Sequence, residues 1–206
     1  WWMVNYGDTI TSVDFPLHEY IIALLMGLLG TSAPWVFRLW TLLCSLAGLW
    51  CLYLLARRLT GDTLRPLFIL LLAATSPLYA YYFANYLPSA PALALIMAGL
   101  WAYTEYWHNG RPRYWYFSVA LLTLGALTRT SQLVPLVAVF CFELLRIIRK
   151  ESPLRGKVVT VVASMLLIGG YWMWNMQLRA QHGAMFLSEL NPLTAGDNMR
   201  LVREAV

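Results

Sequence analysis

Residues 14–58, DFPLHEYIIALLMGLLGTSAPWVFRLWTLLCSLAGLWCLYLLARR, decide the fold. The stretch opens with ionisable residues and a short apolar segment, followed by a longer apolar run that begins at Arg38 and ends at Arg57 and Arg58. The short segment has about thirteen residues, whereas a helix needs roughly 20 to cross the hydrocarbon core of a bilayer. The stretch therefore predicts an interfacial helix over 17–30 and then a membrane-spanning helix.

The composition of the whole chain indicates an integral membrane protein. Hydrophobic residues make up 60% of the chain and charged residues 12%, with a mean hydropathy of +0.58. In soluble domains about a quarter of the residues are charged. The net charge of +5 comes from basic residues in short loops between apolar runs. Such loops are typical of membrane proteins, whose orientation they determine. Nucleic acid is therefore excluded as a partner, and the lipid bilayer is the expected surroundings.

Apolar windows along the chain predict six membrane spans, near 38–56, 66–85, 89–107, 114–129, 131–148 and 157–176. Pro77 lies inside the second window and predicts a kink or a break near the outer surface. Residues 1–16 are expected to end an outer loop, and residues 177–206 to form an outer segment. The expected fold class is all-α: one polytopic transmembrane helical bundle over 1–206 with an interfacial juxtamembrane helix.

The distribution of basic residues predicts the orientation of the bundle. Ten of the fifteen Lys and Arg residues lie in alternate loops, which should be cytoplasmic: Arg57, Arg58, Arg65, Arg111, Arg113, Arg146, Arg149, Lys150, Arg155 and Lys157. Both ends of the chain should then lie outside. The chain has neither an initiating methionine nor a signal peptide, so we expect a fragment that lacks at least one upstream helix.

Ionisable side chains in or near the bilayer cost free energy unless they are paired or hydrated, so each needs an explanation. Glu105 and Glu143 lie toward the predicted cytoplasmic ends of their helices. Arg146 is one turn from Glu143, and the loop with Arg111 is close to Glu105. For these two carboxylates we expect structural pairing.

A second polar set lies near the predicted outer surface: Asp14, His18, Glu19, Arg38, Asn85, Ser89 and Arg129. Asp14 and Glu19 are the candidate catalytic carboxylates; the other five are candidates for substrate binding, with guanidinium groups for phosphate oxygens. For Asp14 the alternative is a helix cap, for His18 and Glu19 a solvated helix face, and for the two arginines interface anchors. Asp14, His18 and Glu19 have no fixed ligand spacing, so no metal ligands are assigned. No cofactor is expected with certainty, and a divalent metal stays open.

Two runs, DFPLHEYIIALLMGLLGTSAPWVFRLWTLLCSLAGLWCLYLLARRLTG and SPLYAYYFANYLPSAPALALIMAGLWAY, resemble the GT-C glycosyltransferases. The resemblance is in particular to bacterial relatives of the dolichyl-phosphate-mannose protein mannosyltransferases and of the lipid A aminoarabinose transferase. The resemblance covers most of the chain, including WMWNMQLRAQHGAMFLSELNP. There are two departures. The family's acidic dyad belongs upstream of the proline motif, before this chain begins, and Pro88 and Ser89 stand where relatives often have Pro-Asp.

The resemblance implies a membrane-bound glycosyltransferase that moves a sugar from a polyprenyl-phosphate-linked donor to an acceptor on the extracytoplasmic side, with inversion. The acceptor is a lipid, a protein or a polysaccharide. The expected location is a bacterial inner membrane, multi-pass, with the active site facing outward. The alternatives are a lipid-linked sugar transporter or flippase subunit and a non-catalytic membrane scaffold. A transporter favours broken helices with polar groups at mid-membrane, whereas here the polar groups gather at one surface.

Overall fold

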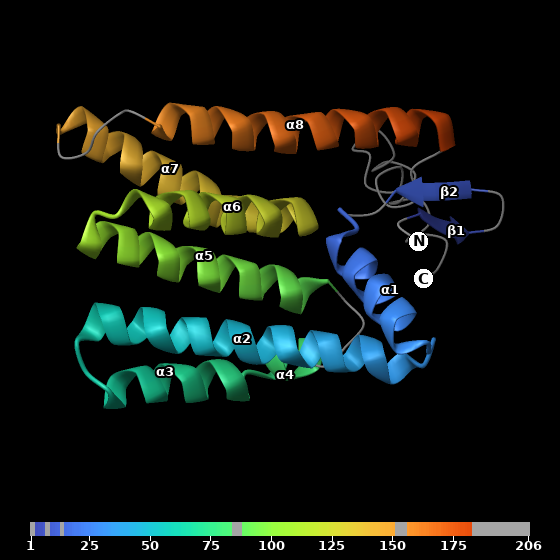
Figure 1. Cartoon of the computed structure of the whole chain (residues 1–206), viewed down its shortest axis with the longest axis horizontal. Helices are drawn as coiled ribbons and strands as arrows, with labels where there is room; N and C mark the ends of the chain where they lie inside the picture. Colours follow the sequence, from blue (N-terminus) through green and yellow to red (C-terminus); the bar gives the residue numbers. More distant parts are fainter. Residues whose placement is uncertain (1–2, 7–8, 13–14, 84–87, 151–155, 183–206) are drawn as a thin grey trace, which may run out of the picture.

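The computed structural model describes residues 3–6, 9–12, 15–83, 88–150 and 156–182. Within these ranges the chain forms α-helices and one short hairpin (Figure 1). The elements in order are β1 (Met3–Tyr6), β2 (Thr9–Ser12), α1 (Leu17–Leu29), α2 (Pro34–Thr60), α3 (Leu64–Thr75), α4 (Pro77–Tyr82), α5 (Ser89–Asn109), α6 (Pro112–Thr128), the 3₁₀ turn η1 (Thr130–Gln132), α7 (Leu133–Ile148) and α8 (Lys157–His182). This confirms the helical membrane bundle predicted from the sequence.

The antiparallel hairpin β1–β2 is the one addition to the expected all-α fold in the described part of the chain. Its register pairs Met3 with Ser12 and Tyr6 with Thr9. The sequence places this segment at the end of an outer loop. The alternation of polar and apolar side chains in TIT (9–11), directly after a Gly-Asp dipeptide, is the local signal that favours strands.

Among the described residues, three helical segments are long and apolar enough to cross a membrane: Pro34–Thr60, Thr130–Ile148 and Lys157–Gln177. The other expected spans also contain helices, but these are shorter or less apolar. Helix α6 has 17 residues, and α5 has 21 but carries Glu105 and several polar aromatic side chains. Both lie in the middle of the bundle, where buried faces contact other helices, so they need not be apolar all round.

The expected span at 66–85 is not one helix, because the chain breaks at Ser76. Helix α3 ends at Thr75 and α4 begins at Pro77, with Ser76 in an extended conformation (φ −58°, ψ 126°). A proline ring disfavours the helical conformation of the preceding residue and cannot donate a backbone hydrogen bond. The break predicted at Pro77 is confirmed.

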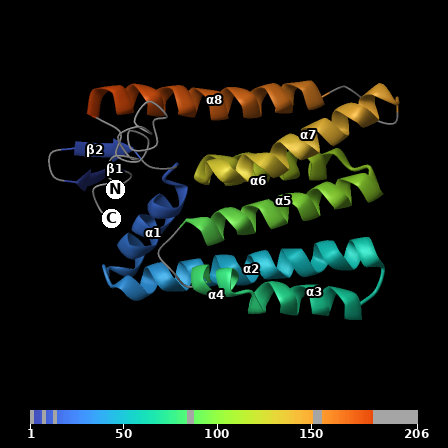
Figure 2. The same cartoon turned by 180° about the vertical axis from the view of Figure 1, so that it is seen from behind.

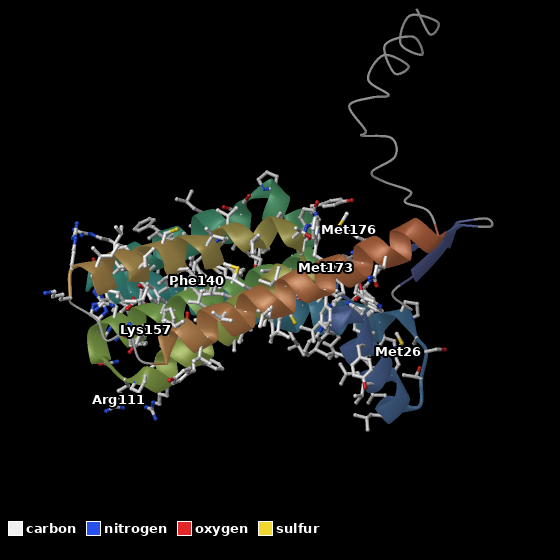
Figure 3. All side chains as sticks on the ribbon, turned by 90° about the horizontal axis from the view of Figure 1, so that it is seen from above. Met26, Arg111, Phe140, Lys157, Met173 and Met176 are labelled. Atoms are coloured by element: carbon white, nitrogen blue, oxygen red, sulfur yellow. The ribbon has the colours of Figure 1, made fainter. Side chains whose placement is uncertain are left out.

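The helices α2, α3 and α5 to α8 run roughly side by side, and their turns gather at two ends (Figures 1 and 2). One end, here called the basic end, comprises residues 57–65, 108–113, 146–150 and 156–157. The opposite end, here called the hairpin end, contains the two strands, α1, α4 and the α6–α7 turn. Figure 3 shows Arg111 and Lys157 at the basic end and Met26 of α1 at the other. The basic loops that alternate along the sequence thus lie together at one end of the bundle.

The core lies where α5 packs between α2 and α6, and small residues bring these helices together. A Cβ atom added to Gly99 would lie 2.7 Å from Cγ of Leu122, and one added to Gly125 would lie 2.8 Å from Cδ1 of Ile96. Leu122 has 0% of its surface exposed and Ile96 has 2%. The position of α5 therefore depends on glycine at these contacts, since any side chain there would push the helices apart.

Glu105 and Glu143 are both paired, and Glu105 has a different partner from the one that the sequence predicts. Glu143 is buried and accepts hydrogen bonds from the Tyr103 hydroxyl (2.9 Å), from Arg146 (3.2 Å) and from Lys157. Its expected pairing with Arg146 is confirmed. Glu105, however, pairs with Nε of Arg58 at 3.3 Å rather than with the loop of Arg111. The last turn of α2 lies beside α5, a neighbour relation that spacing along the chain does not reveal.

Candidate functional site

The segment before α1 attaches this helix to the hairpin end of the bundle. The backbone N–H of Phe15 donates to the carbonyl of Leu127 at the end of α6 (3.2 Å). The ring of Phe15 meets that of Tyr171 on α8 edge to face, with 5.1 Å between centroids. Helix α1 then buries His18 and Ile22, which lie one turn apart on one face. These contacts fix the position of α1 at the end of α6 and α8.

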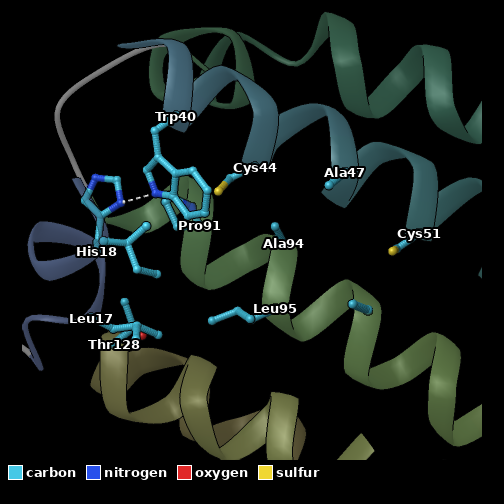
Figure 4. A pocket seen from close by; sticks show the side chains of 12 residues that line it. Leu17, His18, Trp40, Cys44, Ala47, Cys51, Pro91, Ala94, Leu95 and Thr128 are labelled. Carbon is cyan, nitrogen blue, oxygen red and sulfur yellow. Dashed lines mark hydrogen bonds between the residues drawn. The ribbon is translucent and has the colours of Figure 1, made fainter. Parts of the chain in front are cut away.

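His18 is the most buried ionisable residue of the predicted set, with 1% of its surface exposed. Indole Nε1 of Trp40, on α2, donates a hydrogen bond to Nδ1 of His18 at 3.1 Å (Figure 4). The ring of Phe37 packs edge-on against the imidazole, at 4.8 Å between centroids. Burial lowers the pKa of His18 to about 4, so the ring is neutral at pH 7.

The contact with Trp40 decides which tautomer of His18 is present. An indole N–H is only a donor, so Nδ1 must be the unprotonated nitrogen that accepts from it. A neutral imidazole then carries its proton on Nε2. This atom is buried and has no hydrogen-bond partner among the described residues. Buried donors usually have a partner, so this Nε2–H group is an exception among the described residues.

An apolar cavity of about 270 Å³ lies next to His18, between α1, α2 and α5 (Figure 4). Its walls are Leu17, His18, Ile21, Trp40, Cys44, Ala47, Cys51, Pro91, Ala94, Leu95, Ala98 and Thr128. Apart from His18, Trp40 and Thr128, these side chains offer hydrocarbon or sulfur surface. The cavity suits an apolar chain rather than a sugar.

A second cavity, of about 480 Å³, brings Ser89 and Arg129 together. Its walls are Ala73, Ser76, Tyr79, Tyr82, Phe83, Ser89, Ala90, Leu93, Arg129 and Gln132. Arg129 ends α6 in an extended conformation, and its Nη1 donates a hydrogen bond to the Ser89 hydroxyl at the start of α5. The guanidinium is half-buried and forms no ion pair with a described carboxylate. It therefore lines the cavity as a cation with a neutral hydroxyl partner in Ser89.

The two cavities flank the same pair of helix ends. Thr128 lines the apolar cavity and the next residue, Arg129, lines the polar one. On α5, Pro91 lines the first cavity while Ser89 and Ala90 line the second. The hairpin end thus combines a polar cavity that contains a cation with an apolar cavity beside the buried His18. Of the predicted residues that the structure describes, His18 lines the apolar cavity, and Ser89 and Arg129 line the polar one.

Of the other four predicted residues, the structure describes two, Glu19 and Arg38. Glu19 is half-buried in the first turn of α1, and Arg38 is exposed near the start of α2. Neither lines either cavity. Asp14 and Asn85 lie outside the described residues. The roles expected for these four remain predictions.

Several cavity residues were not identified as site residues from the sequence. The spacing of Trp40 from His18 gives no signal of their contact, because it depends on how α1 turns back onto α2. Tyr79 fixes α4 to α2, since its hydroxyl donates to the carbonyl of Ser45 at 2.8 Å. Its position next to Pro77 at a predicted surface also fits a membrane-interface aromatic residue, so the sequence alone did not separate the two roles.

The part of the chain that the structure describes contains no group of three His, Cys, Asp or Glu side chains able to hold a metal ion. Because Asp14 lies outside that part, the expected alternative of a site from Asp14, His18 and Glu19 is not tested.

With this arrangement in view, the comparison with protein families is decisive. The family model of the dolichyl-phosphate-mannose-protein mannosyltransferases matches residues 14–174. The chain belongs to this family. No curated protein and no solved structure matches the chain. The match runs from just before α1 into α8, so it includes both cavities and every residue of the predicted polar set.

Membership in the mannosyltransferase family confirms the resemblance seen in the sequence and identifies a membrane glycosyltransferase. Glycosyl transfer needs a polar cavity for the sugar and groups that stabilise the leaving group as it gains negative charge. Among the described residues of the hairpin end, Arg129 is a cation in the polar cavity, and His18 lies beside the apolar one.

Proposed function

We propose that this protein transfers a sugar from a polyprenyl-phosphate-linked donor to an acceptor at the extracytoplasmic membrane surface. The observation that carries the proposal is the half-buried Arg129, held by Ser89 in a polar cavity beside an apolar one. A lipid-linked phosphate has the matching character, since an anionic group adjoins a long apolar chain. Family membership supports the same reaction class.

The proposed role of Arg129 is to bind the donor phosphate. A guanidinium presents five N–H donors in a fork that fits two phosphate oxygens, and charge-assisted bonds of this kind are about twice as strong as neutral ones. The hydroxyl of Ser89 fixes the orientation of the side chain by accepting from Nη1. Ser89 stands where relatives often have an acid, so at this position the arginine meets a neutral hydroxyl.

His18 acts in this proposal as a hydrogen-bond donor and not as a base. Its Nδ1 is occupied by the Trp40 N–H, and its Nε2 carries the proton. A neutral donor within a buried site stabilises a phosphate oxygen as negative charge develops on it. The apolar cavity next to His18 then takes the first part of the polyprenyl chain.

The chemical step is a single displacement with inversion. The acceptor hydroxyl oxygen bonds to the anomeric carbon, its proton passes to a carboxylate, and the bond from that carbon to the phosphate oxygen breaks. The leaving phosphate keeps the electron pair, which Arg129 and His18 stabilise. Asp14 and Glu19 are the candidates for the base, and Arg38 and Asn85 for further contacts with the substrates. The acceptor is a lipid, a protein or a polysaccharide.

The sidedness is proposed from the separation of the two ends. The basic loops gather at the end opposite the two cavities (Figures 1 and 2). Loops rich in Lys and Arg stay in the cytoplasm. The hairpin end would then face outward from a bacterial inner membrane, where lipid-linked sugars meet their acceptors.

The proposal is tested with the full chain in liposomes that contain a polyprenyl-phosphate-linked radioactive sugar and extracted membrane acceptors. The rate at which the sugar leaves its carrier is compared between the unchanged chain, Arg129→Gln and Arg113→Gln. Arg113 lies at the basic end over the ring of Tyr114 and serves as the control. We expect Arg129→Gln to lower the rate about 100-fold or more and Arg113→Gln to leave it unchanged.

Equal rates for Arg129→Gln and the unchanged chain would contradict the proposal. Movement of the intact donor across the bilayer without release of sugar would instead identify a flippase subunit, the alternative function from a different class. No binding and no transfer of the donor would favour a non-catalytic scaffold.

A further inference from the structure

A third cavity lies at the basic end and has no role in the proposed transfer. It is polar and has a volume of about 520 Å³. Its walls come from the end of α2, the turn before α3 and one face of α5: Leu54, Arg57, Arg58, Gly61, Asp62, Thr63, Trp101 and Glu105. Helix α2 is one of the segments long and apolar enough to span a membrane, and it ends at Thr60. The cavity therefore lies at the depth of lipid headgroups.

We propose that this cavity binds a membrane phospholipid whose headgroup combines a phosphate with a primary ammonium, the phosphoethanolamine class. The lining contains both signs of charge, two guanidinium groups and two carboxylates, so it suits a zwitterion better than a simple anion. The proposal is independent of the transfer reaction, because the two sites lie at opposite ends of the bundle.

The guanidinium groups are the expected contacts for the phosphate. Arg57 is exposed and has no ion pair with any described carboxylate. Arg58 uses Nε for its ion pair with Glu105 at 3.3 Å. Glu105 also accepts from the side-chain amide of Asn109 at 2.6 Å. The Glu105 carboxylate is thus fully engaged, and it fixes Arg58 in the wall of the cavity.

Asp62 is the expected contact for the ammonium. Its Oδ1 accepts the backbone N–H groups of Thr63 (2.6 Å) and Leu64 (3.2 Å) before α3. Its Oδ2 lies 3.8 Å from Nε of Arg65, a long ion pair that leaves room for a closer cation. The indole of Trp101 lines the same cavity and adds an aromatic face for a positive charge.

An exposed apolar stripe on α2 gives the acyl chains a continuous path to the cavity. Leu43, Leu46 and Trp50 are 52%, 49% and 62% exposed. With Leu54 and Arg57 they follow at intervals of three or four residues, so they lie along one face of the helix. A phospholipid bound with its phosphate at Arg57 can lay its chains along this stripe.

The test uses the full chain in detergent, titrated with dioleoyl lipids that carry ethanolamine, choline or glycerol headgroups, with bound lipid counted by native mass spectrometry. We expect the ethanolamine lipid to bind tightest. Replacing Arg57 with glutamine should weaken it about tenfold, because a charge-assisted contact is lost. Asp62→Asn should remove the preference over choline, since a trimethylammonium group has no N–H to donate.

Arg111→Gln is the matched control, because Arg111 is an exposed arginine at the same end that does not line the cavity. It should bind the ethanolamine lipid like the unchanged chain. Tighter binding of the glycerol lipid would overturn the headgroup assignment in favour of a plain anion site. Equal binding by Arg57→Gln and Arg111→Gln would overturn the site itself. Melting temperatures without added lipid show whether each variant is folded.

Discussion

Trp40 on α2 donates its indole N–H to Nδ1 of His18 on α1 across 3.1 Å, and this contact fixes the protonation of the buried imidazole. The histidine is neutral and carries its proton on Nε2, the nitrogen that has no partner in the described part of the chain. The ring thus accepts through Nδ1, which leaves Nε2–H as the group of His18 that can donate.

The tautomer of His18 should depend on Trp40. In the unchanged chain, ¹⁵N chemical shifts of labelled histidine should show the proton on Nε2, assigned by comparison with His18→Gln. In Trp40→Phe the donor to Nδ1 is lost, so both tautomers should appear and the free energy of unfolding should fall by about 1–2 kcal/mol. A proton on Nδ1 in the unchanged chain would refute the assignment.

Burial of His18 should make the fold less stable in acid. Its pKa is lowered to about 4 in the folded chain, against about 6.5 when exposed, so the unfolded chain takes up the proton first as the pH falls. The stabilisation is complete above pH 6.5, and about 3 kcal/mol is lost as the pH falls from 6.5 to about 4. The measurement is the difference in unfolding free energy between the unchanged chain and His18→Gln across this range. A constant difference would contradict the lowered pKa.

The buried cluster around Glu143 should be a main attachment of α8 to the bundle. Lys157→Met leaves the Glu143 carboxylate without one of its two cationic partners, so we expect a loss of about 3–5 kcal/mol in thermal or denaturant unfolding. Adding Glu143→Gln to this variant should restore part of the stability, because the uncompensated charge is removed. Lys150→Met, at an exposed position of the same end, is the control and should change stability by less than about 0.5 kcal/mol. Additive losses in the double variant would show that the pair does not interact.

Two glycine substitutions should have opposite effects. Gly99→Ala places a methyl group 2.7 Å from Leu122, so the helices must move apart at a cost of about 1–3 kcal/mol. Gly169, on α8, has nothing within 4 Å of such a methyl group. Gly169→Ala should stabilise the helix by about 0.5–1 kcal/mol. If both variants melt at the same temperature, the close packing of α5 on α6 is wrong.

Local chemistry explains what the sequence predicted correctly. Pro77 breaks its helix because the ring acts on the adjacent backbone, whatever the rest of the fold does. Successive helices run in opposite directions, so alternate loops lie at the same end of the bundle. This prediction holds even where the predicted helix boundaries are wrong by a few residues. Ser89 and Arg129 meet because each lies at a helix end on the same side of the bundle.

Rotation of helices about their axes explains what the sequence did not predict. Both arginines of the pair at the end of α2 fit a positive loop, yet only the packing of α2 on α5 shows that Arg58 meets Glu105. The same holds for Trp40, whose contact with His18 depends on the angle at which α1 crosses α2. The hairpin β1–β2 was missed because a polar and aromatic segment before a membrane helix also fits a loop.

The most direct test of the central claim is the affinity of the full chain in detergent for a polyprenyl phosphate without a sugar. This measurement depends on the phosphate site and not on a complete catalytic apparatus. We expect Arg129→Gln to bind about tenfold more weakly or worse, Arg129→Lys to be intermediate, and Arg113→Gln to match the unchanged chain. If Arg129→Gln binds polyprenyl phosphate as tightly as the unchanged chain, Arg129 is not the phosphate site and the proposed transfer loses its main support.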